Sequence, residues 1–269
     1  MPIHLFNTDS ARKLFAGVSR EKLLPGKKVR HEFKYILTPH QARLIEEYID
    51  RRHLSTDEYA KDGEYAITSL YFDTPCLRDY YEKLAGLERR QKLRARVYGS
   101  DFLDQNQNHV WLEQKCKKNM TTFKYRTHIS AADWNAFCGP NKVSFDICSI
   151  YGAHKDKEGF RRFAFPFARD CYKPHVVVRY KRRAFEGEFF ANFRLTLDSK
   201  IETGRWNDFA RGTELLPVAR GKVVMEVKFT EAMPWWFRHL LEKFNLSRKV
   251  FSKYVNAVDT IHRAKPLPR

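Results

Sequence analysis

A row of cations on one strand is the first feature of the sequence that could do chemistry. The segment ERRQKLRARVYGSD spans residues 88–101. At the period of two that a β-strand imposes, four cations share one face of it: Arg90, Lys92, Arg94 and Arg96. Same-face neighbours lie about 6.7 Å apart and repel by about 2.4 kcal/mol at an effective dielectric of about 20, less when fully solvated. A bound polyanion would relieve this repulsion, because Arg forks and Lys charges suit phosphate oxygens.

The same period places charged side chains on one face of six further segments. The cations in these rows are Arg30, Lys34, Lys115, Lys117, Lys124, Arg126, His128, Arg179, Lys181, Arg183, Arg194, Lys200 and Lys228. A single row of this kind is typical of a strand with one solvent-exposed face. Seven rows dominated by Arg and Lys favour an anion-binding face, because solvent-exposed faces usually mix these residues with Ser, Thr and Gln.

Two arrangements could use such a face. In an open nucleic-acid-binding sheet, aromatic side chains alternate with the cations and stack on bases. Here the cationic face is nearly free of aromatics, with Tyr98 and Trp111 near strand ends as the exceptions. The other arrangement is a closed barrel with the charged face inward, whose lumen binds phosphates while helices cover the apolar exterior. We therefore expect a phosphate-binding tunnel and no nucleic-acid partner.

Four carboxylates interrupt the cationic rows: Glu32, Glu113, Asp198 and Glu226. They would weaken a surface that only binds phosphate, but carboxylate oxygens can hold Mg²⁺ or Mn²⁺ that bridges a phosphate chain. Ion pairing with neighbouring Arg or Lys is the alternative for each of them. Glu226 lies between two apolar runs in VVMEVKF, so we take it as the first candidate for a metal ligand, followed by Glu32 and Asp198.

Strand and helix signals alternate along the chain. Strands are expected at residues 29–37, 64–74, 88–101, 109–118, 120–130, 173–186, 191–201 and 221–229. Helices are expected at residues 38–52, 75–86, 131–138, 233–246 and 255–264, the first with Thr38 as N-cap and Pro39 at its first position. A helical lead-in covers residues 1–28, and residues 139–172 form an irregular insertion. The sum predicts one α+β domain, residues 29–269, in which eight antiparallel strands form a barrel with peripheral helices.

Composition limits the partners and the compartment. A formal net charge of +18 indicates a polyanionic partner. Because the chain has no apolar run of membrane-spanning length and no apolar segment near its N-terminus, we expect neither a membrane span nor a secretory signal. Its five cysteines include no C-x-x-C pair, which argues against a disulfide framework and a zinc site. A reducing, cytoplasmic location is expected.

Eight motifs, in this order, resemble the catalytic domain of the vacuolar transporter chaperone (VTC) family, which belongs with the CYTH proteins to the triphosphate tunnel metalloenzymes. The motifs are RHEFKY, SLYFDT, YYEKLAGLERRQKLRARVYG, WLEQKCKK, VRYKRRAF, FRLTLDSKI, VMEVKF and FSKY, and they span about residues 29–260. The resemblance implies an eight-stranded antiparallel tunnel and synthesis of inorganic polyphosphate from ATP with a divalent metal.

The resemblance and the strand parity together assign roles to residues of this chain. The catalytic residues would be Arg94, Arg96, Lys115, Arg179, Arg194 and Lys228. The substrate-binding residues would be Arg30, Lys34, Lys92, Lys124, Arg126, Lys181 and Lys253. The ligands of Mn²⁺ or Mg²⁺ would be Glu226, Glu32 and Asp198.

One departure from the tunnel hydrolases bears on the reaction. Those enzymes typically begin with E-x-E-x-K, whereas this chain has Arg30, Glu32 and Lys34. Replacing one carboxylate by a cation favours a phosphate-chain binder, so we expect a polyphosphate polymerase that transfers the γ-phosphoryl group of ATP to a growing chain. Two alternatives stay open: a metal-dependent inorganic or nucleoside triphosphatase of the same fold, and a non-catalytic polyanion- or RNA-binding barrel.

Overall fold

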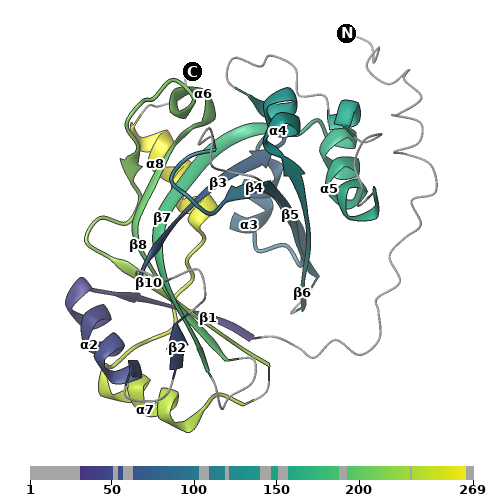
Figure 1. The fold of residues 1–269 in the computed structure, drawn as a ribbon. Helices are drawn as coiled ribbons and strands as arrows, with labels where there is room; N and C mark the ends of the chain where they lie inside the picture. Colours follow the sequence, from purple (N-terminus) through teal and green to yellow (C-terminus); the bar gives the residue numbers. More distant parts are fainter. Residues whose placement is uncertain are drawn as a thin grey trace.

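A strongly curved antiparallel sheet organises the molecule (Figure 1). The computed structural model describes residues 31–50, 54–56, 63–102, 109–118, 121–139, 147–150, 157–187, 193–230 and 232–264. Hydrogen-bonded neighbours follow the order β1-β10-β8-β7-β3-β4-β5-β6, with β2 beside β7 and β9 beside β8. Within these residues, no helix is long and apolar enough to cross a membrane.

The expected strands are all present, and two short ones join them. The strands are β1 (His31–Leu37), β2 (Leu54–Thr56), β3 (Tyr65–Asp73), β4 (Arg89–Val97), β5 (His109–Lys118), β6 (Thr121–Ser130), β7 (Lys173–Gly187), β8 (Arg194–Arg205), β9 (Leu216–Pro217) and β10 (Val223–Phe229). The expected hairpin is confirmed, because β5 pairs with β6 from His109 opposite Ser130 to Lys118 opposite Thr121.

The five expected helices are present, and α5, α6 and a 3-10 turn join them. They are α2 (Pro39–Asp50), α3 (Arg78–Leu84), α4 (Ala131–Cys138), α5 (Lys157–Arg169), α6 (Trp206–Phe209), α7 (Trp235–Lys243), α8 (Lys253–Ala264) and the 3-10 turn η1 (Ile147–Ile150). Thr38 caps α2 as expected: its hydroxyl accepts from the backbone N–H of Gln41, whose side chain accepts from the N–H of Thr38. The insertion at 139–172 contains η1 and α5, and the lead-in at 1–28 lies outside the described residues.

Two apolar clusters cover the outer face of the sheet. Helices α4 and α5 pack on β5 and β6 through a cluster that includes Trp134 and Phe163 and extends to Leu93 of β4. Helices α2 and α7 pack on β10 and β8 through a second cluster that includes Ile45 and Phe237. Each such side chain stabilises the fold by about 1.5–3 kcal/mol when fully buried. These helices therefore stabilise the curved sheet by packing on its outer face.

A third cluster lies on the opposite, inner face. Here α8 packs through Val258 and its neighbours against Val176, Val178 and Val224. These strand positions alternate with Val177 and Met225, which belong to the outer clusters. Helix α8 thus occupies part of the inner face and leaves the remainder to charged side chains.

Among the described residues, the large antiparallel sheet is present but its closure into the expected barrel is not detected. Strands β1 and β6 stand at the two ends of the strand order, and in the part of the chain that is described no backbone pairing joins them. A side-chain contact links the two arms of the sheet, which are β1 and β10 on one side and β4 to β6 on the other: Lys115 Nζ of β5 lies 3.0 Å from Glu32 Oε2 of β1. Parity predicts which face of a strand is charged, but it carries no information about whether the first and last strands pair.

Candidate functional site

Four cations surround one buried carboxylate on β4, β5 and β6. Glu113 Oε2 lies 2.6 Å from Arg94 Nε and 4.0 Å from Arg96 Nη1. Its Oε1 lies 2.5 Å from Lys124 Nζ and 3.4 Å from Arg126 Nε. Burial alone would raise the pKa of Glu113, but these cations hold it well below its ordinary value. We call these five residues the β4–β6 wall; it carries a large excess of positive charge.

The strand register explains why these side chains meet. Arg94 stands opposite Glu113, and Glu113 stands opposite Arg126, so the three form one row across the sheet. The guanidinium groups are also held by neutral acceptors: Arg94 donates to the Tyr71 hydroxyl, and Arg96 donates to Ser69 Oγ at 3.0 Å. Because these partners are uncharged, they orient the guanidinium groups without neutralising them.

On β1 and β10, lysines and carboxylates interleave more evenly. Lys34 Nζ lies 3.3 Å from Glu32 Oε1 and 3.4 Å from Glu226 Oε2. Lys228 pairs with the other oxygen of Glu226. Burial and the nearby carboxylate of Glu226 act to raise the pKa of Glu32, but the surrounding lysines outweigh them and lower it to about 2. Both carboxylates are therefore ionised at neutral pH.

A third carboxylate extends this group onto β8. Asp198 is fully buried and accepts two hydrogen bonds from Arg182, at 2.7 and 2.9 Å. Lys253, at the start of α8, approaches its Oδ2 at 2.5 Å. Burial would raise the pKa of Asp198, but the two cations lower it to about 2. We call the seven residues Glu32, Lys34, Arg182, Asp198, Glu226, Lys228 and Lys253 the β1–β10–β8 wall.

Lys92 lies on the same inner face, beside the start of α8. Its Nζ donates to Ser252 Oγ at 3.0 Å and lies 5.0 Å from the centroid of the Tyr254 ring. Burial first, and then neighbouring cations, lower the pKa of this amine to about 7. Lys92 is therefore only partly protonated at neutral pH.

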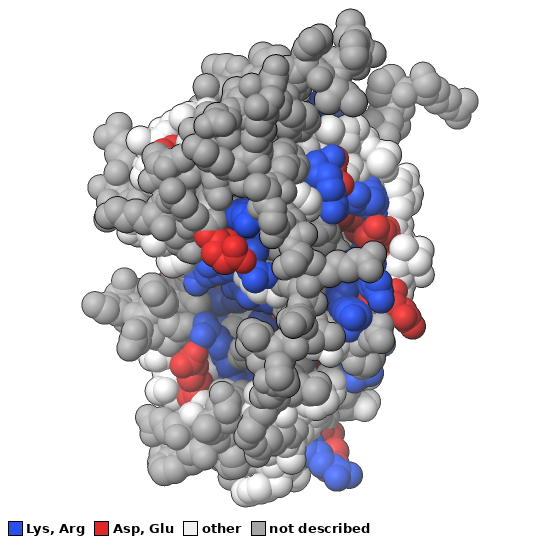
Figure 2. All heavy atoms as spheres, turned by 90° about the vertical axis from the view of Figure 1, so that its right-hand side faces the viewer, with Lys and Arg blue, Asp and Glu red and all other residues white. Residues whose placement is uncertain are grey.

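The charged face is hollowed and strongly basic. Figure 2 shows Lys and Arg side chains gathered in a recess of this face, with Asp and Glu at isolated places. Such a face suits a chain of phosphates, because several cations can contact successive phosphoryl groups.

Sequence comparison gives the family of the chain. Residues 29–262 match the VTC domain, which is most of the chain. The chain belongs to the VTC domain family. The Vacuolar transporter chaperone complex subunit 4 of Schizosaccharomyces pombe is 25% identical to this VTC domain over 275 residues. That alignment covers 87% of this chain and 37% of the relative, so the chain spans little more than a third of the length of that protein.

Solved structures with a similar arrangement are more distant in sequence. A putative adenylate cyclase from Bacillus halodurans aligns with a TM-score of 0.49 and 13% identity, covering 84% of this chain and 95% of that one. A putative adenylyl cyclase from Hippeastrum with a dominant triphosphatase activity aligns with a TM-score of 0.42 and 17% identity, covering 90% and 98%.

Most of the expected site residues of this VTC domain lie together on the inner face. Those in the two walls are Glu32, Lys34, Arg94, Arg96, Lys124, Arg126, Asp198, Glu226, Lys228 and Lys253. Lys92 and Lys115 lie beside them, and Arg194 stands opposite Lys228, where its Nη1 lies 2.5 Å from Glu186. Arg30 is outside the described residues.

The expectation for β7 was wrong. Arg179 and Lys181 have the parity of the outward-facing Val177, and they pair with Glu202 and Glu64 outside the charged face. The sequence reasoning missed Arg182, which takes the inner position. The run VRYKRR has cations on both parities, and Val176 to Val178 are all buried, so neither charge nor hydrophobicity could reveal the inner parity.

The donor set for a divalent metal can be tested on these contacts. Glu32 and Glu226 are both ionised and share one lysine, Lys34. Mg²⁺ is commonly held by one or two carboxylates together with substrate phosphates and water, so this pair fits. Lysines lie at both oxygens of Glu32 and of Glu226. Asp198 fits less well because it is fully buried and is held at short range by Arg182 and Lys253, whereas the Glu32 side chain is partly exposed. Across the described residues, no three His, Cys, Asp or Glu side chains form a ready-made cluster.

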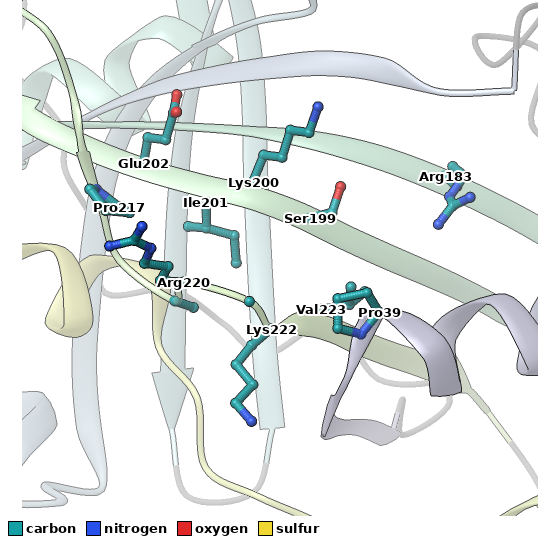
Figure 3. A pocket seen from close by; sticks show the side chains of 12 residues that line it. Pro39, Arg183, Ser199, Lys200, Ile201, Glu202, Pro217, Arg220, Lys222 and Val223 are labelled. Carbon is teal, nitrogen blue, oxygen red and sulfur yellow. The ribbon is translucent and has the colours of Figure 1, made fainter.

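A separate cavity of about 400 Å³ lies where β8 and β9 meet the segment before β10. Its apolar lining includes Ile201 and Val223, and basic side chains stand around it. Figure 3 shows Lys200 and Lys222 pointing in opposite directions from it. Because these charges diverge, the cavity is a poorer anion site than the inner face.

Proposed function

We propose that this VTC domain is a metal-dependent polyphosphate polymerase, which transfers the γ-phosphoryl group of ATP to the end of an inorganic polyphosphate chain. The observation that carries the proposal is the β4–β6 wall, in which four cations share the single carboxylate of Glu113. Excess positive charge that the protein does not neutralise itself favours a ligand with several adjacent negative charges.

The roles follow from the contacts. Arg94, Arg96 and Lys124 would bind the triphosphate and stabilise negative charge on the transferring group. Arg126, Lys92 and Lys34 would hold the neighbouring phosphates. Asp198 would act as a positioning residue, since it fixes Arg182 and Lys253 through short contacts.

The chemical step needs little covalent participation from the protein. The bond between the γ-phosphorus and its bridging oxygen breaks, a terminal oxygen of the chain forms the new bond, and ADP leaves. The attacking oxygen is already ionised at neutral pH, so no strong general base is required. Held by Glu226 and Glu32, Mn²⁺ or Mg²⁺ would supply charge neutralisation on the phosphates. Catalysis then rests on positioning and on charge stabilisation.

The proposal includes a closed tunnel in the working state. The contact between Lys115 and Glu32 supports it, because these residues belong to the two arms of the sheet. Phosphates bound to both walls at once would draw the arms together, since each arm presents cations to the same polyanion.

The test is to incubate the purified chain with ATP and Mn²⁺, resolve the products on a gel stained for polyphosphate, and assay free phosphate in parallel. A ladder of lengthening chains with matching ADP is the expected result. Phosphate release without chains would replace the polymerase by a triphosphatase. With neither product, and with RNA outcompeting tripolyphosphate for binding, the chain would be a nucleic-acid-binding module instead.

A further inference from the structure

An aromatic cluster adjoins the phosphate-binding cations on the inner face. It consists of Tyr65 on β3, Tyr98 just after β4, Trp111 on β5 and His128 on β6, and we call it the aromatic rim. The ring centroids of Trp111 and His128 lie 5.2 Å apart, and those of Tyr65 and Tyr98 lie 6.2 Å apart. Trp111 is half-buried, and no role in the phosphate chemistry uses it.

The strand register fixes the distance from the rim to the charged wall. Trp111 stands opposite Arg96 on one side and opposite His128 on the other. The next inner row is the one that contains Glu113 and Arg94. Same-face rows are about 6.7 Å apart along a strand. The aromatic rim therefore lies one same-face row away from the row of Arg94 and Glu113, where the triphosphate is proposed to bind.

Arg126 connects the two groups directly. Its guanidinium carbon lies 3.5 Å from the centroid of the Trp111 ring, and its Nη2 donates to the Tyr98 hydroxyl at 3.1 Å. The same guanidinium reaches Glu113 at 3.4 Å. One side chain thus spans from the aromatic rings to the phosphate cations, as a site for a ligand with both a flat ring and a phosphate chain requires.

We propose that the aromatic rim binds the nucleobase of the nucleoside triphosphate donor, an inference that rests on the proposed function. A base stacks on aromatic side chains whatever its identity, because every base has a π-face. With the base on the face of the Trp111 ring that the Arg126 guanidinium does not cover, the triphosphate runs along Arg96 and Arg94 towards Glu226. The γ-phosphate then lies deepest, next to the lysines of the other wall.

The aromatic rim would also distinguish the donor, ATP, from the product, inorganic polyphosphate. Inorganic polyphosphate has no ring to stack, so it gains nothing from Trp111, whereas ATP gains the stacking contact in addition to its phosphates. The donor therefore has a defined end and a defined direction on a face whose cations alone would accept a phosphate chain in either direction.

The test measures binding without turnover. Calorimetric titrations with ATP and with tripolyphosphate are run on the full chain in EDTA, for the native protein and for Trp111→Leu, Trp111→Phe and Trp235→Leu. We expect Trp111→Leu to weaken ATP binding about tenfold and to leave tripolyphosphate binding within twofold. Trp111→Phe should recover most of the ATP affinity, because it keeps a stacking ring. Trp235 on α7 is 68% exposed, so its substitution serves as the matched control.

The outcomes separate this inference from the function beneath it. If Trp111→Leu weakens both ligands equally, Trp111 only supports Arg126, and the nucleobase site is refuted. If it weakens neither, the site is refuted while phosphate binding stands. If the native protein binds neither ligand, the proposed function itself falls, and the nucleobase site falls with it.

Discussion

The two walls of the inner face differ in the ratio of cations to carboxylates. In the β4–β6 wall, four cations share Glu113. In the β1–β10–β8 wall, four cations contact three carboxylates, which are Glu32, Asp198 and Glu226. The β4–β6 wall can bind an anion because its own positive charge is not balanced. The second is nearly neutral and offers oxygen ligands, so it suits a metal and the reacting end of a phosphate chain.

The largest effect is expected at the single carboxylate of the β4–β6 wall. Glu113→Gln should lower the free energy of unfolding by about 3–5 kcal/mol, because four cations lose the buried carboxylate that they share. Thermal unfolding measures this loss. Tripolyphosphate should restore much of it by supplying the missing negative charge. Glu202→Gln, which removes a half-exposed partner of Arg179, should change stability by less than about 1 kcal/mol. A variant that tripolyphosphate cannot rescue would argue against anion binding at this wall.

At the other wall, Glu226→Gln should separate turnover from binding. We expect the rate of ATP consumption with Mn²⁺ to fall by about a hundredfold or more, because a ligand of the proposed metal is lost. Affinity for tripolyphosphate should stay nearly unchanged, since the cations of the β4–β6 wall remain. Equal losses in rate and affinity would mean that the two walls do not divide these tasks.

Arg94 and Arg179 form a matched pair for the inner and outer faces. Both are arginines paired with a glutamate, at 2.6 and 3.1 Å, but only Arg94 lies on the charged face. Arg94→Met should weaken tripolyphosphate binding about tenfold or more, through the loss of a charge-assisted hydrogen bond, whereas Arg179→Met should have little effect. The measurement is a titration of each variant. A substantial loss for Arg179→Met would contradict the outward orientation.

The smallest expected effect is the uptake of protons when tripolyphosphate binds. At pH 8 the Lys92 amine is mostly neutral, since burial first and cationic neighbours second bring its pKa to about 7. The charged groups that face it are Lys34, Lys83, Lys115 and Asp79. A bound phosphate favours the protonated amine, so binding of tripolyphosphate at pH 8 should take up as much as about one proton.

This uptake is measured from binding enthalpies in buffers of different ionisation enthalpy. Lys92→Met should reduce it to the smaller uptake at Lys124, whose pKa burial lowers to about 8, and Lys181→Met on the outer face should leave it unchanged. The pKa shift also fixes how the contribution of Lys92 to folding stability changes with pH. The folded pKa of Lys92 is below the ordinary 10.5, so its penalty on folding is fully present below pH 7 and fades as the pH rises towards 10.5. Uptake that Lys92→Met does not reduce would assign the proton to another group.

Sequence could predict these walls only where a strand is polar on one face and apolar on the other. On β4 the period of two separates Arg94 and Arg96 from the buried Leu93 and Ala95, so the inner face follows directly. On β7 both faces are buried or charged, and Arg182 escaped notice. The pairing of Arg126 with both Trp111 and Glu113 depends on register between strands, which no single strand reveals.

The strand order also bears on how the molecule folds. The β4–β6 wall comes from strands that follow one another closely, whereas Glu32 and Glu226 meet only when β1 pairs with β10, at nearly opposite ends of the chain. Contacts between distant segments form slowly, because long loops must close first. We expect the cationic wall to exist early in folding and the carboxylate pair to arrive last. During synthesis on the ribosome, the chain would thus display its attraction for polyanions before it could assemble both carboxylates of the proposed metal site.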